Sequence, residues 1–481
     1  MKYKLLSFLF LFLLSFSQYS YSQLKIRGRA ESSISFGHGE NNPFWFTANQ
    51  FGISSLKNNN GYIRGAVFAQ KQLDSKWSLE AGADIVGAYR FQSDFFIQQA
   101  FFSANYKYWS LVAGSKEYEP DIVDRKLSSG GLVYSGNARP IPQIRLSIPE
   151  YVPLKFTNDW AALKGHIAYG MFMDNGFQQE FTNKENDYVK NALYHSKSGF
   201  LRIGKPNSIL NFEGGLTMFA RFGGKKYFKD GTSFANPKTL KDFARIFFMY
   251  SGGSKSLEAD QLNVLGDHLG NWSLALNVNL GDWKIRPYYE HQFEDHSMLF
   301  MEYPWKDGLY GIEVCFPKNR FITKFVFEYM NSRDQSGPIY HDTTDEIPDQ
   351  ISSRDNYFNH YFYQAWQHSG FGIGSPLYFS PMYNSERTLF FQSNRQKTTH
   401  IGFEGNPFDQ ISYRVLFSYI RNWGTYEKPF REISKSCCSL IELNYNPINH
   451  AKWNFKLSAA LDNSKWIGSN KGVKLSVSRI F

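Results

Sequence analysis

The segment that most constrains the fold is Gly472–Phe481, at the C-terminal end of the chain. Apolar and polar side chains alternate strictly along it, in the order Val473, Lys474, Leu475, Ser476, Val477 and Ser478. Strict alternation predicts a β-strand with one apolar and one polar face. Because the segment is apolar up to Phe481, it has to be paired and covered. Two folds satisfy this requirement: an outer-membrane β-barrel, whose closing strand often ends on Phe as an assembly signal, and a soluble β-sandwich with this segment at its edge.

The other end of the chain has the features of a secretory signal peptide. Lys2 and Lys4 precede an apolar run over Leu5–Phe16, and small serines precede a cleavage point before Gln23. The run is too short for a membrane-spanning helix, and no later segment has the roughly 20 apolar residues that such a helix needs. The sequence shows no linker or break in composition after it. We therefore expect a signal peptide over residues 1–22 and one mature domain over residues 23–481, either released or inserted as a barrel.

Composition and charge are consistent with a barrel. The chain is polar on average, with a mean hydropathy of −0.43, yet 18% of its residues are aromatic. A barrel with a wet interior and aromatic girdles combines these two properties. The formal net charge of +10 suits acidic partners such as lipopolysaccharide headgroups or acidic polysaccharide. We expect no nucleic acid partner, because a signal peptide directs the chain out of the cytoplasm.

The connections between alternating segments favour the barrel over the sandwich. Residues 272–280, 411–419 and 453–462 repeat the alternation, which alone does not separate the two folds. Long polar stretches alternate with short turns; the long stretches are roughly Gly37–Asn60, Glu117–Ala138, Asn175–Ser196, Phe222–Gly270, Glu294–Asp307, Ser332–Arg387 and Asn422–Cys437. Outer-membrane barrels have short periplasmic turns and long extracellular loops. We therefore expect an all-β fold, a transmembrane antiparallel β-barrel of about 18 strands, with Leu389–Glu404 taken as one long strand.

One segment breaks the strand pattern. Leu240, Phe243 and Phe247 recur at helical spacing, and Asn236-Pro237 is suited to the start of a helix. The sequence predicts a short helix over residues 238–250, inside a long loop. Its apolar stripe needs a cover, and we expect the barrel mouth or lumen to provide it.

Three stretches then resemble one protein family. They are, first, Ser128-Ser129-Gly130-Gly131-Leu132, Ser135-Gly136-Asn137-Ala138-Arg139-Pro140-Ile141-Pro142-Gln143 and Ile148-Pro149-Glu150-Tyr151; second, Asp267-His268-Leu269-Gly270; and third, Asp355-Asn356-Tyr357-Phe358-Asn359, Gly372-Ile373-Gly374-Ser375-Pro376-Leu377, Asn394-Arg395 and Gly424-Thr425-Tyr426. The chain resembles the Wzi family of capsule-assembly outer-membrane proteins, in the form common in Bacteroidetes. The resemblance implies a barrel of about 18 strands that acts as a surface lectin and retains capsular polysaccharide. Better-known members carry a periplasmic helical plug near the start, whereas here strand pattern begins directly after the signal peptide.

Polar residues near a Pro-rich strand entry are one set of candidate glycan contacts. Asn137 and Gln143 can bind hydroxyls, and Arg139 and Arg145 can bind a carboxylate or sulfate of an acidic glycan. The alternative is that they line the lumen and pair with inward-facing carboxylates.

Aromatic residues on the long loops are a second set of candidates. Trp45 lies in the first long loop, and Tyr357 and Trp366 lie in the longest one. Aromatic rings can stack on sugar rings while their polar tips bind hydroxyls. Alternatively, these residues pack the loops together or form the outer girdle.

No other motif points to a different chemistry. The sequence has no metal-ligand spacing and no nucleophile motif, so we expect no metal, no cofactor and no enzymatic activity. The expected function is binding of capsular or surface polysaccharide in the outer membrane; a porin or solute channel is the alternative. The other expected partners are membrane lipid, lipopolysaccharide and the barrel-assembly machinery, which would engage the strand that ends at Phe481.

Overall fold

The computed structural model shows one closed barrel. It describes residues 24–254, 256–257, 261, 264–294, 299, 306–335, 355–448 and 452–481, so the predicted signal peptide lies outside the described residues. The barrel sheet has 18 strands: β1 Leu24–His38, β2 Asn60–Gln72, β3 Trp77–Tyr89, β4 Phe95–Tyr106, β5 Trp109–Ser115, β6 Gln143–Pro153, β7 Ala161–Met171, β9 Leu193–Ile203, β10 Leu210–Phe222, β13 Asp267–Leu280, β14 Trp283–Phe293, β15 Gly308–Cys315, β16 Lys324–Asn331, β21 Gln396–Phe408, β22 Ile411–Gly424, β23 Pro429–Tyr445, β24 Trp453–Ser464 and β25 Asn470–Ile480. The predicted all-β antiparallel barrel is confirmed.

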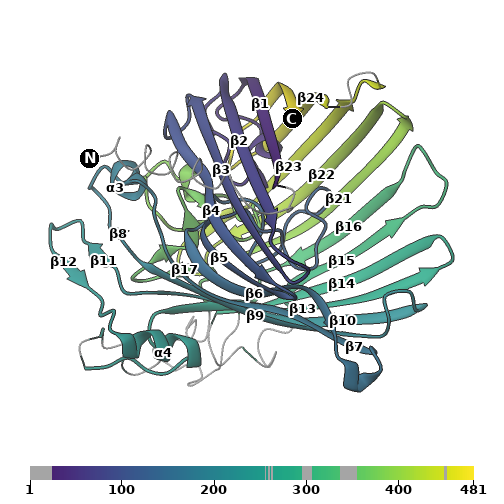
Figure 1. Cartoon of the computed structure of the whole chain (residues 1–481). Helices are drawn as coiled ribbons and strands as arrows, with labels where there is room; N and C mark the ends of the chain where they lie inside the picture. Colours follow the sequence, from purple (N-terminus) through teal and green to yellow (C-terminus); the bar gives the residue numbers. More distant parts are fainter. Residues whose placement is uncertain are drawn as a thin grey trace.

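The first and last strands close the barrel. β1 pairs antiparallel with β2 on one side and with β25 on the other, from Arg29 opposite Ile480 to His38 opposite Lys471 (Figure 1). The Phe481 N–H adds a bond of 2.9 Å to the Gly28 carbonyl. Each of the 18 barrel strands is thereby paired on both sides, which a sheet in lipid requires because an unpaired backbone group there costs several kcal/mol.

Alternation along each strand separates the outer wall from the lumen. On β25, Val473 and Leu475 face outward and are 43% and 47% exposed, whereas Lys474 and Ser476 face the lumen. Outward-facing apolar residues recur on neighbouring strands and form the apolar belt expected of an outer-membrane barrel. Within the described part of the chain, no helix has the length and apolar character to cross a membrane.

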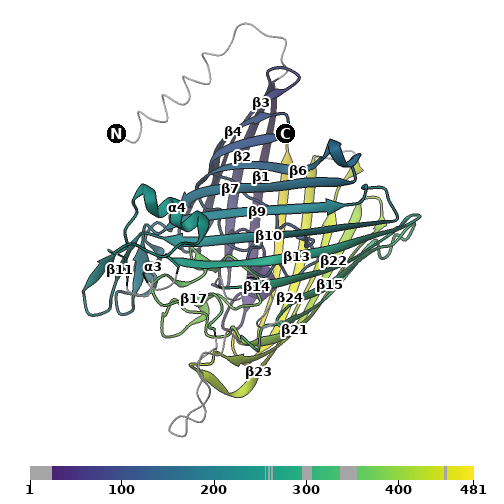
Figure 2. The same cartoon turned by 90° about the horizontal axis from the view of Figure 1, so that it is seen from below.

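The two ends of the barrel differ as predicted, with two corrections. Short turns gather at one end and long loops at the other, which in outer-membrane barrels is the extracellular end (Figure 2). The prediction of a long loop over Asn422–Cys437 is wrong, because β22 and β23 extend through it and only residues 425–428 connect them. The single strand over Leu389–Glu404 is also wrong: β21 begins at Gln396, because the backbone before it bonds to its own loop, as in Ala365 N–H to Leu389 O at 2.8 Å.

The predicted loop helix is present as α4, Leu240–Phe248. Its N-cap is Thr239, which forms a capping box with Asp242, rather than Asn236; the Asn236 amide instead donates to the Tyr363 hydroxyl at 3.1 Å. The expected cover is wrong: α4 lies on the outer face of the barrel wall, beside β9 and β10 (Figures 1 and 2). Two shorter α-helices, α2 Phe44–Thr47 and α3 Phe177–Phe181, and two 3-10 turns, η1 Lys155–Thr157 and η2 Pro381–Tyr383, lie in other connections.

Smaller sheets form within the long loops. β8 Tyr188–Lys190, β11 Lys225–Tyr227 and β12 Ser233–Ala235 make a three-stranded sheet, hereafter the projecting sheet, which extends beyond the barrel rim (Figure 1). Two strand pairs, β17 Asn359–His360 with β18 Gln364–Ala365 and β19 Gln367–His368 with β20 Phe371–Gly372, lie in the longest loop.

Candidate functional site

Three long loops fold into the lumen and fill its extracellular half; we call this the plug. It consists of loop 1 (residues 39–59), loop 3 (116–142) and the described part of loop 7 (355–395). Loop 3 joins the other two. The Gly52 N–H of loop 1 donates to Asn137 O at 2.7 Å, and the Ser135 N–H donates to Ile373 O of loop 7 at 2.8 Å. The loop 3 stretch that carries the family resemblance is therefore the centre of the plug.

Carboxylates on the inner wall hold the plug in place. Glu328 of β16 accepts hydrogen bonds from Ser128 Oγ at 2.5 Å and from Ser129 N at 2.7 Å. Glu290 of β14 accepts from Leu132 N, also at 2.7 Å. Loop backbone amides that are buried away from water need such acceptors, because a buried N–H group without a partner is costly.

Arg221 of β10 fixes loop 7 to the wall. Its Nε donates to Asp267 Oδ2 at 2.6 Å, and its Nη1 and Nη2 atoms donate to the backbone carbonyls of residues 363–365 at 2.6–3.0 Å. The guanidinium is 4% exposed. The planar guanidinium therefore donates the hydrogen bonds that water would otherwise give to three backbone carbonyls and one buried carboxylate.

Two loop carboxyls at the edge of the plug have raised pKa values. Burial raises the pKa of the Asp307 carboxyl from 3.8 to about 7, although the amides of Gln335 and Asp334 favour its charged form. Burial also raises the pKa of Glu294, which accepts from Phe358 N at 2.9 Å. A carboxyl whose folded-state pKa is raised stabilises the fold fully below its unfolded pKa, and this stabilisation is lost as pH rises through the folded pKa.

We therefore expect the start of loop 7 to loosen between pH 6 and pH 8.5. Amide hydrogen exchange of residues 355–360, corrected for intrinsic rates, should be faster at pH 8.5. The variant Asp307→Asn with Glu294→Gln should exchange at the same corrected rate at both pH values, because neither side chain then titrates. A pH dependence that survives in the double variant contradicts the assignment to these two carboxyls.

The predicted polar candidates all lie in the plug or on the inner wall. Asn137 is 4% exposed; its Nδ2 donates to Gly372 O at 2.9 Å and its Oδ1 accepts from Asn49 N. Gln143 is buried at the start of β6. Arg139 and Arg145 lie over aromatic rings, at 3.6 Å from the Phe96 centroid and 4.1 Å from that of Tyr118. The placement matches the lumen-lining alternative, and the partners seen among the described residues are aromatic rings.

The predicted aromatic candidates pack the loops together. Trp45 is 3% exposed, and its Nε1 donates to Cys438 O at 3.3 Å. Tyr357 and Trp366 are fully buried: the Tyr357 hydroxyl donates to Asp307 Oδ2 at 3.2 Å, and Trp366 Nε1 donates to Val133 O at 2.8 Å. None of the three lies on the outer surface. Their contribution to glycan binding stays a prediction, and their burial in the plug does not favour it.

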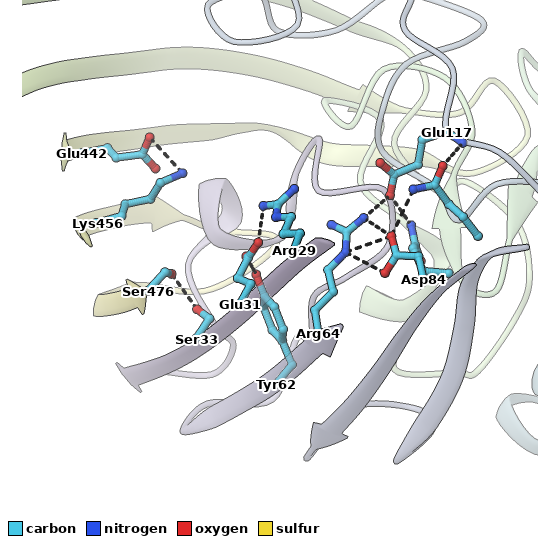
Figure 3. Close-up of polar contacts among 12 residues, drawn as sticks. Arg29, Glu31, Ser33, Tyr62, Arg64, Asp84, Glu117, Glu442, Lys456 and Ser476 are labelled. Atoms are coloured by element: carbon cyan, nitrogen blue, oxygen red, sulfur yellow. Dashed lines mark hydrogen bonds and ion pairs between the residues drawn. The ribbon is translucent and has the colours of Figure 1, made fainter. Parts of the chain in front are cut away.

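Below the plug, the periplasmic half of the lumen is a polar cavity of about 520 Å³, hereafter the vestibule. Seven cationic and four carboxylate side chains line it: Arg29, Arg64, Arg125, Lys126, Arg414, Lys456, Lys474, Glu31, Glu117, Glu404 and Glu442. Figure 3 shows Arg64 between Asp84 and Glu117, with Nη2–O distances of 2.5 and 3.0 Å. Arg414 and Lys456 flank Glu442 in the same way, at 3.2 and 3.5 Å. The vestibule ends on Trp45 and Phe46 of the plug.

Sequence reasoning missed both the wall carboxylates and the vestibule. Glu290, Glu328 and Glu442 occupy inward-facing positions that alternate with outward-facing side chains such as Phe327 and Ile441. The phase of alternation was therefore enough to place these carboxylates inside the barrel. Their loop partners were not readable, because they are up to 200 residues away in sequence.

Aromatic and basic side chains, some of them exposed, gather on and beside the projecting sheet. On the projecting sheet, the Tyr188 and Tyr227 rings stack at 4.9 Å, and Lys190 Nζ lies 5.6 and 5.8 Å from their centroids. Tyr361 of loop 7 is 49% exposed, and its backbone carbonyl accepts from Lys226 of the same sheet at 2.6 Å. The group combines ring faces with positive charge outside the barrel.

Comparison with solved structures supports the fold. The chain is similar to Wzi of Escherichia coli, described as a carbohydrate-binding β-barrel involved in group 1 capsule assembly; the identity is 13%, the TM-score 0.58, and the match covers 93% of this chain and 83% of Wzi. It is also similar to OccK5 (OpdH) of Pseudomonas aeruginosa, with 8% identity, a TM-score of 0.50 and coverage of 95% and 98%. No protein-family model matches the chain, and no curated protein does. At these identities the likeness shows an outer-membrane barrel fold.

Proposed function

We propose that this outer-membrane barrel is a surface lectin that takes part in capsule assembly, and that it binds and retains capsular or related polysaccharide without cleaving it. The observation that carries the proposal is the plug: extracellular loops are folded into the lumen and held there by wall carboxylates. A solute channel needs an open path, whereas a protein that grips a polymer at the surface does not. The likeness to Wzi, which binds carbohydrate, supports the same function.

The exposed aromatic and basic group is the contact surface that we favour. Tyr361 and Tyr227 offer ring faces for sugar stacking, while the buried Tyr188 supports the Tyr227 ring from beneath. Lys190 and Lys225 offer charge for uronate, sulfate or phosphate groups. Single sugar contacts are weak, so retention at the cell surface comes from many repeats engaging many copies of the protein. The plug residues proposed from the sequence would then support the loops rather than touch the glycan.

Glycan binding should be lost on substitution of the exposed rings. We expect Tyr361→Ala with Tyr227→Ala to release surface polysaccharide into the medium. The same variant should weaken binding of the purified protein to polysaccharide of its own strain by about 1–3 kcal/mol, the scale of base–aromatic stacking. Lys190→Ala with Lys225→Ala should weaken binding mainly at low salt, because exposed charges are screened beyond ~8 Å at physiological ionic strength. The matched control is Tyr89→Ala, an exposed ring at the end of β3. If the purified wild-type protein ignores this polysaccharide at low salt, the lectin proposal fails even though the barrel remains.

We also propose that β25 engages the barrel-assembly machinery. Phe481 carries the last bond to β1, and its ring lies against Gly28, where a side chain at residue 28 would contact it at 3.4 Å. A chain without Phe481 should accumulate less folded barrel in the outer membrane, seen as less of the fast-migrating form on unheated gels. Wild-type amounts of folded barrel in this variant would contradict the proposal.

A further inference from the structure

α4 is attached to the outer wall by specific contacts. Ile246 is fully buried in a cluster with Ala220 and Phe222, which face outward from β10. The Tyr169 hydroxyl of β7 donates to Phe243 O at 3.0 Å, and Lys197 Nζ of β9 donates to Phe247 O at the C-terminal end of the helix. A cation at this position also interacts favourably with the helix dipole. The helix is therefore a fixed part of the wall and not a mobile appendage.

The wall beneath α4 carries polar groups on its outer face. Lys197 and His195 are in phase with Leu201 and Ile203, which are exposed outward on the same strand. The His195 Nδ1 is 2.9 Å from Ala168 O, and its ring lies 5.7 Å from that of Phe247. Ionisable groups are unfavourable on the lipid-facing side of a barrel. α4 covers both of them.

The opposite side of α4 is apolar and exposed. Leu240 and Phe248 are 89% and 61% exposed, and Ala244 lies between them in one stripe with a spacing of four residues. Tyr250, just after the helix, is 62% exposed. A helix whose outer side meets water is polar across that side, whereas here the outer side carries an apolar stripe beside the exposed Lys241.

The exposed stripe is continuous with the lipid-facing belt. The strands that carry α4 also expose Ile167 on β7, Leu201 on β9 and Phe212 on β10, all on the same outer face. Near the start of the helix, Lys238 and Lys241 are exposed. Apolar residues beside basic ones are the pattern of a helix that lies in a membrane interface.

We propose that α4 is an interfacial helix that lies in the outer leaflet along the barrel wall. Leu240, Ala244 and Phe248 contact lipid acyl chains, and Lys238 and Lys241 contact the phosphates of the same leaflet. α4 thereby extends the lipid-facing surface over β9, whose own outer face carries His195 and Lys197 at this level. The proposal is independent of glycan binding.

Lipid contact can be tested with nitroxide labels in proteoliposomes of phosphatidylethanolamine and phosphatidylglycerol. The labels are placed at Leu240→Cys and Phe248→Cys in a background in which Cys315, Cys437 and Cys438 are replaced by alanine. We expect a ratio of oxygen to water-soluble nickel-chelate accessibility several-fold higher than at the control Ser233→Cys, which is exposed on the projecting sheet. Substituting lipopolysaccharide for phosphatidylglycerol should preserve this ratio, because both supply acyl chains and phosphate.

Two results would overturn the proposal. Labels at 240 and 248 that match the Ser233 control show that the stripe faces water. Dipolar broadening between labels on separate molecules shows that a second copy of the chain covers it. Because the cysteine-free background can fail to fold, amide hydrogen exchange of residues 240–248 in lipid nanodiscs gives an independent measurement. Leu240→Gln with Phe248→Gln should exchange several-fold faster there than wild type with an intact barrel, and equal exchange rules the lipid contact out.

Discussion

Replacing Glu328 by alanine should loosen the plug and convert a closed barrel into a conducting one. The substitution leaves Ser128 Oγ, Ser129 N and Tyr288 Oη without their buried acceptor. Each buried donor without a partner costs about 1–3 kcal/mol. In planar bilayers we expect little conductance from the wild-type protein and frequent, larger current steps from Glu328→Ala.

A matched substitution separates plug opening from a change of lumen charge. Glu404 also faces the lumen but lines the vestibule, away from the amides of the plug, so Glu404→Ala should stay as closed as the wild type. Large, stable steps from the wild-type protein itself would favour the channel alternative. A Glu328→Ala variant that remains closed would show that the wall carboxylates do not hold the plug.

The largest loss of stability should follow from Arg221→Met. Methionine fills the volume but leaves Asp267 as a buried charge, 7% exposed, without its partner. Removing one member of a buried pair costs about 3–5 kcal/mol. We expect the temperature at which the unheated gel form is lost to fall markedly and loop 7 to become sensitive to protease.

Two further variants test whether the buried charge is the cause. Arg320→Met breaks a pair with Asp409 at a periplasmic turn, where the side chains are 67% and 80% exposed, and should change stability by about 0–1 kcal/mol. Adding Asp267→Asn to Arg221→Met should restore part of the loss, since no uncompensated charge then remains. Equal losses from Arg320→Met and Arg221→Met would contradict this account.

The barrel was predictable because its signal is local. Each strand alternates with a period of two, and one face must meet lipid while the other meets the lumen, so residues 272–280 and 473–477 show their structure without reference to any partner. The helix range was predictable for the same reason. Its location was not, because an apolar stripe fits an outer wall as well as a lumen, and the wall residues that receive it lie on other strands.

The plug was not predictable because long-range contacts decide it. Trp45 and Trp366 have the composition of surface sugar platforms, yet each indole N–H has a buried carbonyl partner that is more than 200 residues away. Leu389–Arg395 looks like a strand, but the Phe391 N–H bonds to Asn359 Oδ1 at 2.8 Å within loop 7. The local sequence pattern carries no information about such distant partners. The candidate glycan-binding surface is therefore identified by which side chains the structure exposes, and not by residue type alone.

The position of loop 1 in the plug has a consequence for the order of folding. The Phe44 amide bonds to Asp462 Oδ2, 418 residues later in the chain, and Trp45 bonds across 393 residues to Cys438. These contacts need both ends of the chain in the barrel, and contacts of such high sequence separation form slowly. We expect the barrel to pass through a stage with a hollow, water-filled interior, and the lumen to be packed only when β1 and loop 1 lie beside β23 and β24.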